Sequence, residues 1–196
     1  MESDLSTQIN VAGWINENLS IPYSFENDNE TWSHPCFDMV TEHHAAIISL
    51  CQSQLYGSAL ALLRVELEAL VRGLWLRHVA KEKDIAKYKK DKIEPYFYEL
   101  VESVESTVGA SNGVLSYIKD SQWSIFNSFT HTGIEAVSRR IGESTTGHDN
   151  YQETDVVKAL RLSGLFAVFA AVELASLSKN ESIIKSALEF AKEYGK

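Results

Sequence analysis

Proline is rare in this chain, and its rarity limits what the chain can fold into. The three prolines are Pro22, Pro35 and Pro95, and between and after them apolar residues recur every three or four positions. Proline breaks helices, and apolar residues at this spacing form one face of a helix. Strands would instead show a period of two. We therefore expect an all-α protein.

The apolar spacing predicts a series of helices separated by glycine, proline or polar clusters. The expected helices cover residues 5–19, 37–56, 59–80, 95–108, 155–177 and 180–194. A further helical segment is expected from Ser111 or Asn112 to about Thr132, and it should resume over 134–141. Pro35 is expected near the first turn of the second helix. Gly109 is expected to end the fourth helix, and a polar loop is expected over 143–151.

The connections between these helices are short enough for antiparallel neighbours. We expect a single domain, residues 1–196, built as an antiparallel bundle of five to seven helices. The helix over 59–80 and the helix over 155–177 should lie at its centre, because the second is rich in alanine, glycine and serine. An acidic amino-terminal helix and loop, residues 1–36, would precede the bundle core, residues 37–196.

The segments that mark a membrane or an exported protein are not found in the sequence. The longest apolar run, Leu162–Val172, is too short to span a bilayer, and no basic-then-apolar leader begins the chain. Cys36 and Cys51 form neither a disulfide framework nor the paired spacing of a zinc knuckle. We expect a cytoplasmic protein that does not contact membranes.

Charge is unevenly distributed along the chain. The formal net charge is −9, yet residues 1–63 hold eight acidic residues and no lysine or arginine. Residues 64–92 hold nine basic residues against five acidic ones. A nucleic-acid contact would belong to this basic stretch; otherwise its lysines form a solvated connector.

Three charged residues of the helix over 59–80 fall on one ridge beside the apolar face. At about 100° per residue, Arg64, Glu68 and Arg72 are one turn apart from one another. We expect Glu68 to pair with both arginines, because charges beside a core are costly unless they are paired. The array would either stabilise packing or bind a phosphate.

The octet FNSFTHTG, residues 126–133, places two polar side chains one helical turn apart. Asn127 and His131 share a face, and Thr132 with Gly133 lets the chain turn sharply. His131 should therefore lie at a helix end, open to solvent, as a cap or as a catalytic group. Arg139 and Arg140 follow two turns later.

Motifs for the common cofactor and metal classes are missing from the sequence. Phosphate-cradling glycine loops, nucleophile elbows and paired carboxylates do not occur. The spacing of His34, Cys36, His43 and His44 matches no common zinc arrangement. We expect neither a metal nor a cofactor.

Two stretches together resemble a known family. The helix ALALLRVELEALVRGLWLRHV, residues 59–79, is followed about fifty residues later by FNSFTHTG and SRR. The pattern, over roughly residues 40–175, resembles HEPN-like bacterial proteins of the uncharacterised helical type found among toxin and phage-defence genes.

The resemblance implies a helical bundle that dimerises and cuts RNA without a metal. Active members of that family use an arginine, commonly followed by a polar residue, and a histidine just over one turn later. Here Asn127 matches the polar position and His131 the histidine, while Phe126 replaces the arginine.

A guanidinium must then come from elsewhere in the fold if the chemistry is retained. The candidates are Arg64, Arg72, Arg139 and Arg140, with Glu68 beside the first two. Arg72 and His78 form a second pair at the family's spacing, but Gly73 stands where the polar residue should follow.

The leading hypothesis is a HEPN-like ribonuclease of a toxin or phage-defence system. Its ligand would be RNA or a nucleotide. The protein would form a homodimer, and an antitoxin or a defence protein would be its partner. A non-catalytic HEPN-derived interaction module that uses the acidic amino-terminal third is the first alternative. A nucleotide sensor with Arg64, Glu68 and Arg72 in its pocket is the second.

Overall fold

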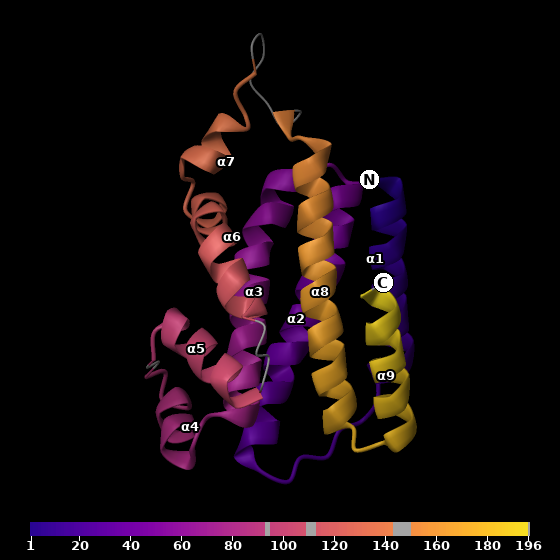
Figure 1. Ribbon diagram of the computed structural model, residues 1–196, viewed down its shortest axis with the longest axis vertical. Helices are drawn as coiled ribbons and strands as arrows, with labels where there is room; N and C mark the ends of the chain where they lie inside the picture. The colour runs from indigo at the N-terminus through magenta and orange to yellow at the C-terminus, as the bar shows by residue number, and fades with distance from the viewer. Residues whose placement is uncertain (93–94, 109–112, 143–149, 196) are drawn as a thin grey trace.

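A computed structural model describes residues 1–92, 95–108, 113–142 and 150–195 (Figure 1). In these ranges the regular elements are α-helices, which confirms the all-α prediction. They are α1 (Glu2–Leu19), α2 (Asp28–Gln52), α3 (Tyr56–His78), α4 (Glu82–Tyr88), α5 (Phe97–Val108), α6 (Val114–Thr130), α7 (Ile134–Ser138), α8 (Glu153–Leu177) and α9 (Glu181–Tyr194). Gly109, the expected caps Ser111 and Asn112, and loop residues 143–149 lie outside the described ranges.

Two of the described helices are short, and the other seven match the upper end of the expected count. The short helix α4 occupies part of the lysine-rich stretch that the charge pattern would leave as a solvated connector. It forms because Ile85 is buried, with 1% of its surface exposed, and because the Asp84 carboxylate accepts the N–H of Lys81 at 3.1 Å. A capping contact and one apolar anchor are enough to order a helix of seven residues.

Helix α2 begins earlier than the apolar pattern predicts, at Asp28 rather than at Phe37. The Asn27 side chain caps it by accepting the N–H of Glu30 at 2.9 Å, and acidic residues in a first turn complement the positive end of the helix dipole. Pro35 consequently lies inside the helix and not in its first turn. The expected division at residue 36 therefore falls within α2 and marks no structural boundary.

Helices α2, α3 and α8 form the middle of the bundle, which places both expected central helices there (Figure 1). Helices α1 and α9 pack against α8 on one side, and α5 and α6 pack against α3 on the other. At Gly164 of α8 a Cβ would overlap the side chains of Gln8 and Tyr194. The small residues of α8 thus let α1 and α9 approach its backbone closely.

Helix α8 is also long and apolar enough to cross a membrane by length and composition, the one such helix in the described part of the chain. Within its most apolar window 61% is buried inside the protein. Burial of this kind is what the core helix of a bundle shows.

Three polar side chains and one backbone carbonyl meet in the core between α1, α2, α3 and α8. Ser163 Oγ lies 2.9 Å from Glu66 Oε1 and 2.8 Å from His44 Nδ1, and His44 Nε2 lies 3.4 Å from the carbonyl oxygen of Gln8. Glu66, Ser163 and His44 are fully buried. His44 is thus part of a hydrogen-bonded chain in the core.

Burial fixes the protonation of this chain of groups. It raises the pKa of Glu66 well above its ordinary value, against the opposing hydrogen bond from Ser163, and it lowers the pKa of His44 to about 4. His44 is therefore neutral at pH 7, and burial favours the neutral form of Glu66. Ser163 Oγ donates to Glu66 Oε1, and Glu66 Oε2 has no hydrogen-bond partner among the described residues.

Candidate functional site

His131 stands at the end of α6, where the sequence predicts a break. Its N–H donates to the carbonyl of Asn127 at 2.9 Å, and the N–H of Gly133 donates to that of Ser128 at 2.7 Å. Thr132 has φ +56°, so the left-handed residue is Thr132 and not the glycine. Gly133 is needed for space, because a Cβ would lie 3.0 Å from Cα of Ser128. The His131 side chain is left exposed at the helix end.

The imidazole of His131 meets an arginine from another helix. Arg64 Nη1 lies 2.5 Å from His131 Nε2, across 67 residues of sequence. An arginine can only donate, so Nε2 accepts and the imidazole is neutral with its proton on Nδ1. The structure therefore brings together a guanidinium and an imidazole that the sequence keeps far apart.

Two contacts fix the Arg64 side chain. Its Nε donates to Glu68 Oε1 at 2.9 Å, and its Cζ lies 4.9 Å from the centroid of the Trp123 ring. Trp123 itself stacks on Phe97, with centroids 4.3 Å apart and planes 8° from parallel. Within the described residues no group accepts a hydrogen bond from the Nη2 nitrogen of Arg64. The N–H donors of this nitrogen therefore remain free to bind an anion.

Asn127 lies one turn before His131 on α6. Its side-chain oxygen is buried and has no donor among the described residues. An acceptor buried without a partner costs about 1–3 kcal/mol, and Glu66 Oε2 and Arg139 Nε are likewise without a partner among the described residues. Its neighbour Phe126, which stands at the family's arginine position, is 2% exposed and belongs to the core.

The expected Arg64, Glu68, Arg72 array is only half formed. Among described residues Glu68 forms an ion pair with Arg64 and none with Arg72. Burial lowers the pKa of Arg72, and the charges of Tyr88, Cys36 and Glu68 act against that shift. Arg72 is thus half-buried near Cys36 of α2 and Tyr88 of α4, and Glu68 acts on it through its charge and not through an ion pair.

The other basic candidates have different surroundings. Nε2 of His78 lies 3.0 Å from the Glu173 carboxylate of α8, so the second arginine–histidine pair is not assembled. Arg139 forms an ion pair with Asp155 of α8 and lies 3.9 Å from Glu135. The ion pair with Asp155 connects the end of α7 to α8. It engages the guanidinium that was expected to contact the substrate.

Arg140 borders a hollow of about 470 Å³ beside the Arg64–His131 pair. Phe129, Thr132 and Tyr151 form its walls together with the first turns of α3, including Ala61, one turn before Arg64. A hollow of this volume accommodates a nucleotide-sized ligand. Arg140 is exposed, and no ion pair engages it within the described ranges.

Gly57 keeps this hollow open at the start of α3. A Cβ at Gly57 would lie 2.6 Å from the hydroxyl of Tyr151 and 3.1 Å from Arg140 Nη2. Sequence reasoning missed Tyr151 and Phe129, whose rings lie 6.3 Å apart. The only sequence indication was that aromatic residues flank the loop on both sides.

The four residues considered as metal ligands do not converge. Cys36 is buried, its pKa is raised to about 11 chiefly by burial, and its thiol donates to the Trp32 carbonyl at 3.6 Å. His34 contacts the ring of Tyr23, and His44 belongs to the core chain. Across the described ranges no three His, Cys, Asp or Glu residues are grouped so that they could hold a metal ion.

Comparison with known proteins adds a family but no activity. No curated protein and no solved structure matches the chain. Residues 37–196 match the model of one protein family, so more than half of the chain is covered and α2 to α9 lie largely within the match. The chain belongs to the DUF6988 family, a family of unknown function.

Proposed function

We propose that this protein is a HEPN-like protein of a bacterial toxin or phage-defence system that cleaves RNA without a metal, using His131 and Arg64. One observation supports the proposal above all others: the Arg64 guanidinium lies 2.5 Å from the His131 imidazole. In HEPN-like ribonucleases, which the sequence resembles, an arginine and a histidine perform the cleavage. Here the arginine comes from α3 instead of the helix that carries the histidine.

The chemistry needs few protein groups because RNA carries its own nucleophile. A phosphate oxygen would take the N–H donors of Arg64, which releases Nε2 of His131 from the guanidinium. Nε2 then accepts the proton of the 2′-hydroxyl while that oxygen attacks phosphorus and the 5′-oxygen leaves, taking a proton from solvent. General-base help of this kind contributes about 10²–10⁴ in rate, and one charge-stabilising donor contributes about 10²–10³.

The surroundings of the pair support an RNA phosphate as ligand. Trp123 and Glu68 hold the guanidinium in place, so little order is lost when an anion binds. The unpaired Asn127 oxygen can receive a hydroxyl hydrogen when a ligand rearranges the site. The hollow with Arg140, Phe129 and Tyr151 can hold an adjoining nucleotide, since bases stack on aromatic rings.

The alternatives use other features of the molecule. A nucleotide sensor would use the same pair and hollow without cleavage, but with Arg140 in place of Arg72. The non-catalytic interaction module would use the acidic amino-terminal third, where four of the eight acidic residues already form ion pairs within the chain. We retain the cytoplasmic homodimer, and its antitoxin or defence-protein partner, as part of the same proposal.

The test is cleavage of labelled single-stranded RNA by the purified protein in the presence of EDTA. We expect the wild type to cut and His131→Ala to lose at least about a hundredfold in rate. His78→Ala is the matched control, because His78 also contacts a charged side chain at the surface but lies on another face with Glu173. Intact RNA with the wild type would refute cleavage, and nucleotide binding that requires Arg64 would then favour the sensor.

A further inference from the structure

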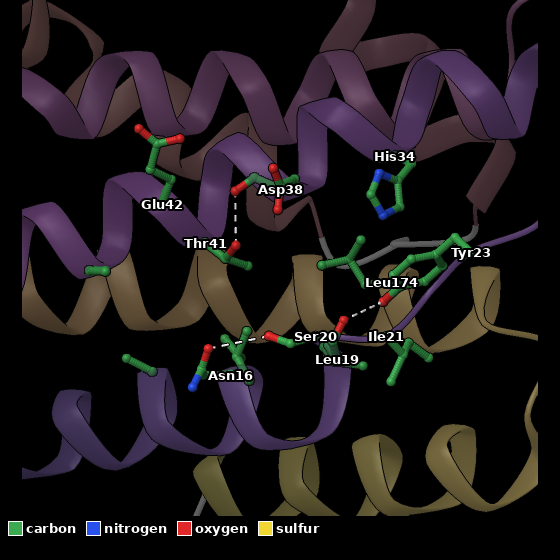
Figure 2. A pocket seen from close by; sticks show the side chains of 13 residues that line it. Asn16, Leu19, Ser20, Ile21, Tyr23, His34, Asp38, Thr41, Glu42 and Leu174 are labelled. Carbon is green, nitrogen blue, oxygen red and sulfur yellow. Dashed lines mark hydrogen bonds between the residues drawn. The ribbon is translucent and has the colours of Figure 1, made fainter.

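A groove on the far side of the bundle from Arg64 is lined by α1, α2 and the segment between them, with Leu174 of α8 at its floor (Figure 2). Its volume is about 550 Å³, which lies within the range of small-molecule sites. It exists because α1 and α2 both pack on α8 but make fewer contacts with each other. The groove therefore runs along two helices.

Two carboxylates with no internal partner line this groove. Among the eight acidic residues of the basic-free segment, four are in ion pairs with basic side chains elsewhere: Asp4 with Arg161, Glu26 with Lys179, Asp28 with Lys89 and Glu30 with Arg77. Within the described residues Asp38 and Glu42 form no ion pair, and both lie on the groove side of α2 (Figure 2). They are one turn apart, about 6 Å along the helix axis.

The end of α1 adds a third negative point. Helix α1 ends at Leu19, and its last turn contains no basic residue. The exposed carbonyls of a helix end carry about half a negative charge. Among the described residues the Leu19 carbonyl accepts the Tyr23 hydroxyl at 3.0 Å and the N–H of Ile21 at 2.9 Å. Ser20 and Ile21, which follow this end, line the groove.

No positive group opposes these charges inside the groove. Its lining contains no lysine or arginine, and burial lowers the pKa of His34 although the Asp38 charge raises it. Burial, and then Asp38, raise the pKa of Tyr23 to about 12. The imidazole and the phenol are therefore neutral at pH 7, and the groove presents only negative charge.

The floor between the charges is apolar. Ile15, Leu19 and Leu174 are buried beneath it, and Tyr23 with His34, whose rings lie 4.4 Å apart, close one end. In Figure 2 Asp38 and Glu42 lie in the upper part of the view and Ser20 in the lower part, with Leu174 between them. A ligand that matches the groove thus needs positive charges several ångströms apart joined by an apolar chain.

We propose that the groove between α1 and α2 binds an aliphatic polyamine. Its ammonium groups would lie at Asp38, at Glu42 and at the carbonyl end of α1, and its methylene segments would cover the apolar floor. A metal cation fits less well, because the described residues hold no group of three metal-binding side chains. The inference is independent of the RNA-cleavage proposal, since the groove shares no residue with the Arg64 site.

The test is calorimetric titration of the full-length protein with spermidine at fixed ionic strength. We expect saturable binding at one site, about fivefold weaker binding for Asp38→Asn and for Glu42→Gln, and loss of measurable binding in the double variant. Both positions are exposed, so the variants should fold, which thermal denaturation checks. Ala45→Phe should also block binding, because Ala45 lines the groove.

Glu17→Gln is the matched control, since Glu17 is an exposed carboxylate of α1 outside the groove. It should bind spermidine like the wild type. Equal weakening by Glu17→Gln would show nonspecific attraction to the acidic surface and overturn the proposal. Undiminished binding by the double variant, or equally tight binding of butylamine, which carries one charge, would overturn it as well.

Discussion

Replacing Glu66 by glutamine should change how the stability of the protein depends on pH. In the native core burial favours the neutral forms of Glu66 and His44, and the ionised form of each group is favoured more when the chain unfolds. The two groups act in opposite directions. The variant removes one of them and keeps the hydrogen bond with Ser163, because the glutamine carbonyl can still accept the Ser163 hydroxyl.

The sign for each group follows from its pKa in the two states. The native pKa of His44 is depressed to about 4 from 6.5, so its contribution is fully present above pH 6.5 and is lost as pH falls toward 4. At about 1.4 kcal/mol per pH unit, this loss amounts to about 3 kcal/mol. The native pKa of Glu66 is raised above 4.5, so its contribution is full below pH 4.5 and is lost as pH rises.

Above pH 4.5 the Glu66 contribution falls while the His44 contribution rises, so the two slopes oppose each other in the wild type. In Glu66→Gln only the His44 slope remains, so the free energy of unfolding of the variant, relative to the wild type, should rise with pH above 4.5, by at most about 1.4 kcal/mol per pH unit. His44→Gln should show the opposite trend.

Urea denaturation of the wild type and both variants at pH 4.5, 5.5, 6.5 and 7.5 measures these differences. Comparing variant with wild type at each pH cancels the contribution of the surface carboxylates. A stability difference for Glu66→Gln that stays constant from pH 4.5 to 7.5 would mean that Glu66 is ionised in the native core. The reasoning from burial would then be refuted.

Four further outcomes follow from the structure. Trp123→Leu removes the ring beneath the Arg64 guanidinium and should lower the RNA-cleavage rate about tenfold, with little change in melting temperature; an unchanged rate would show that Trp123 does not position Arg64. Gly164→Ala should cost about 1–3 kcal/mol in urea denaturation, because its Cβ overlaps Gln8 and Tyr194. Gly13→Ala, where nothing lies within 4 Å of an added Cβ, should instead stabilise the protein by up to about 1 kcal/mol, and a loss of stability there would contradict the packing argument. Thr132→Gly should stabilise the native state by about 1 kcal/mol, because φ is +56° at a β-branched residue; a lower melting temperature would argue against strain at this turn.

The long helices could be predicted from apolar spacing because each one buries apolar residues against its neighbours. Helices α2 and α4 were exceptions: the acidic first turn of α2 has the composition of a loop, although Asn27 caps it by accepting the N–H of Glu30, and α4 lies in the lysine-rich stretch. The helix face on which a residue lies also follows from local spacing, as it does for His131.

Contacts between helices could not be predicted in this way. That Arg64 rather than Arg72 reaches His131 depends on how α3 packs against α6, and no periodicity within α3 distinguishes the two arginines. The same is true of Arg139, which the sequence places near the site and which Asp155 of α8 engages instead. The unpaired groove acids Asp38 and Glu42 were visible only as part of a uniformly acidic segment.

The account depends most on Arg64 and His131 acting together on RNA. A double-mutant cycle on the cleavage rate of single-stranded RNA, with Arg64→Ala, His131→Ala and the combined variant, tests this directly. Groups that act as a unit are strongly non-additive, so the double variant should be no slower than the slower single variant. Rate losses that multiply in the double variant, or single variants as active as the wild type, would contradict a shared site.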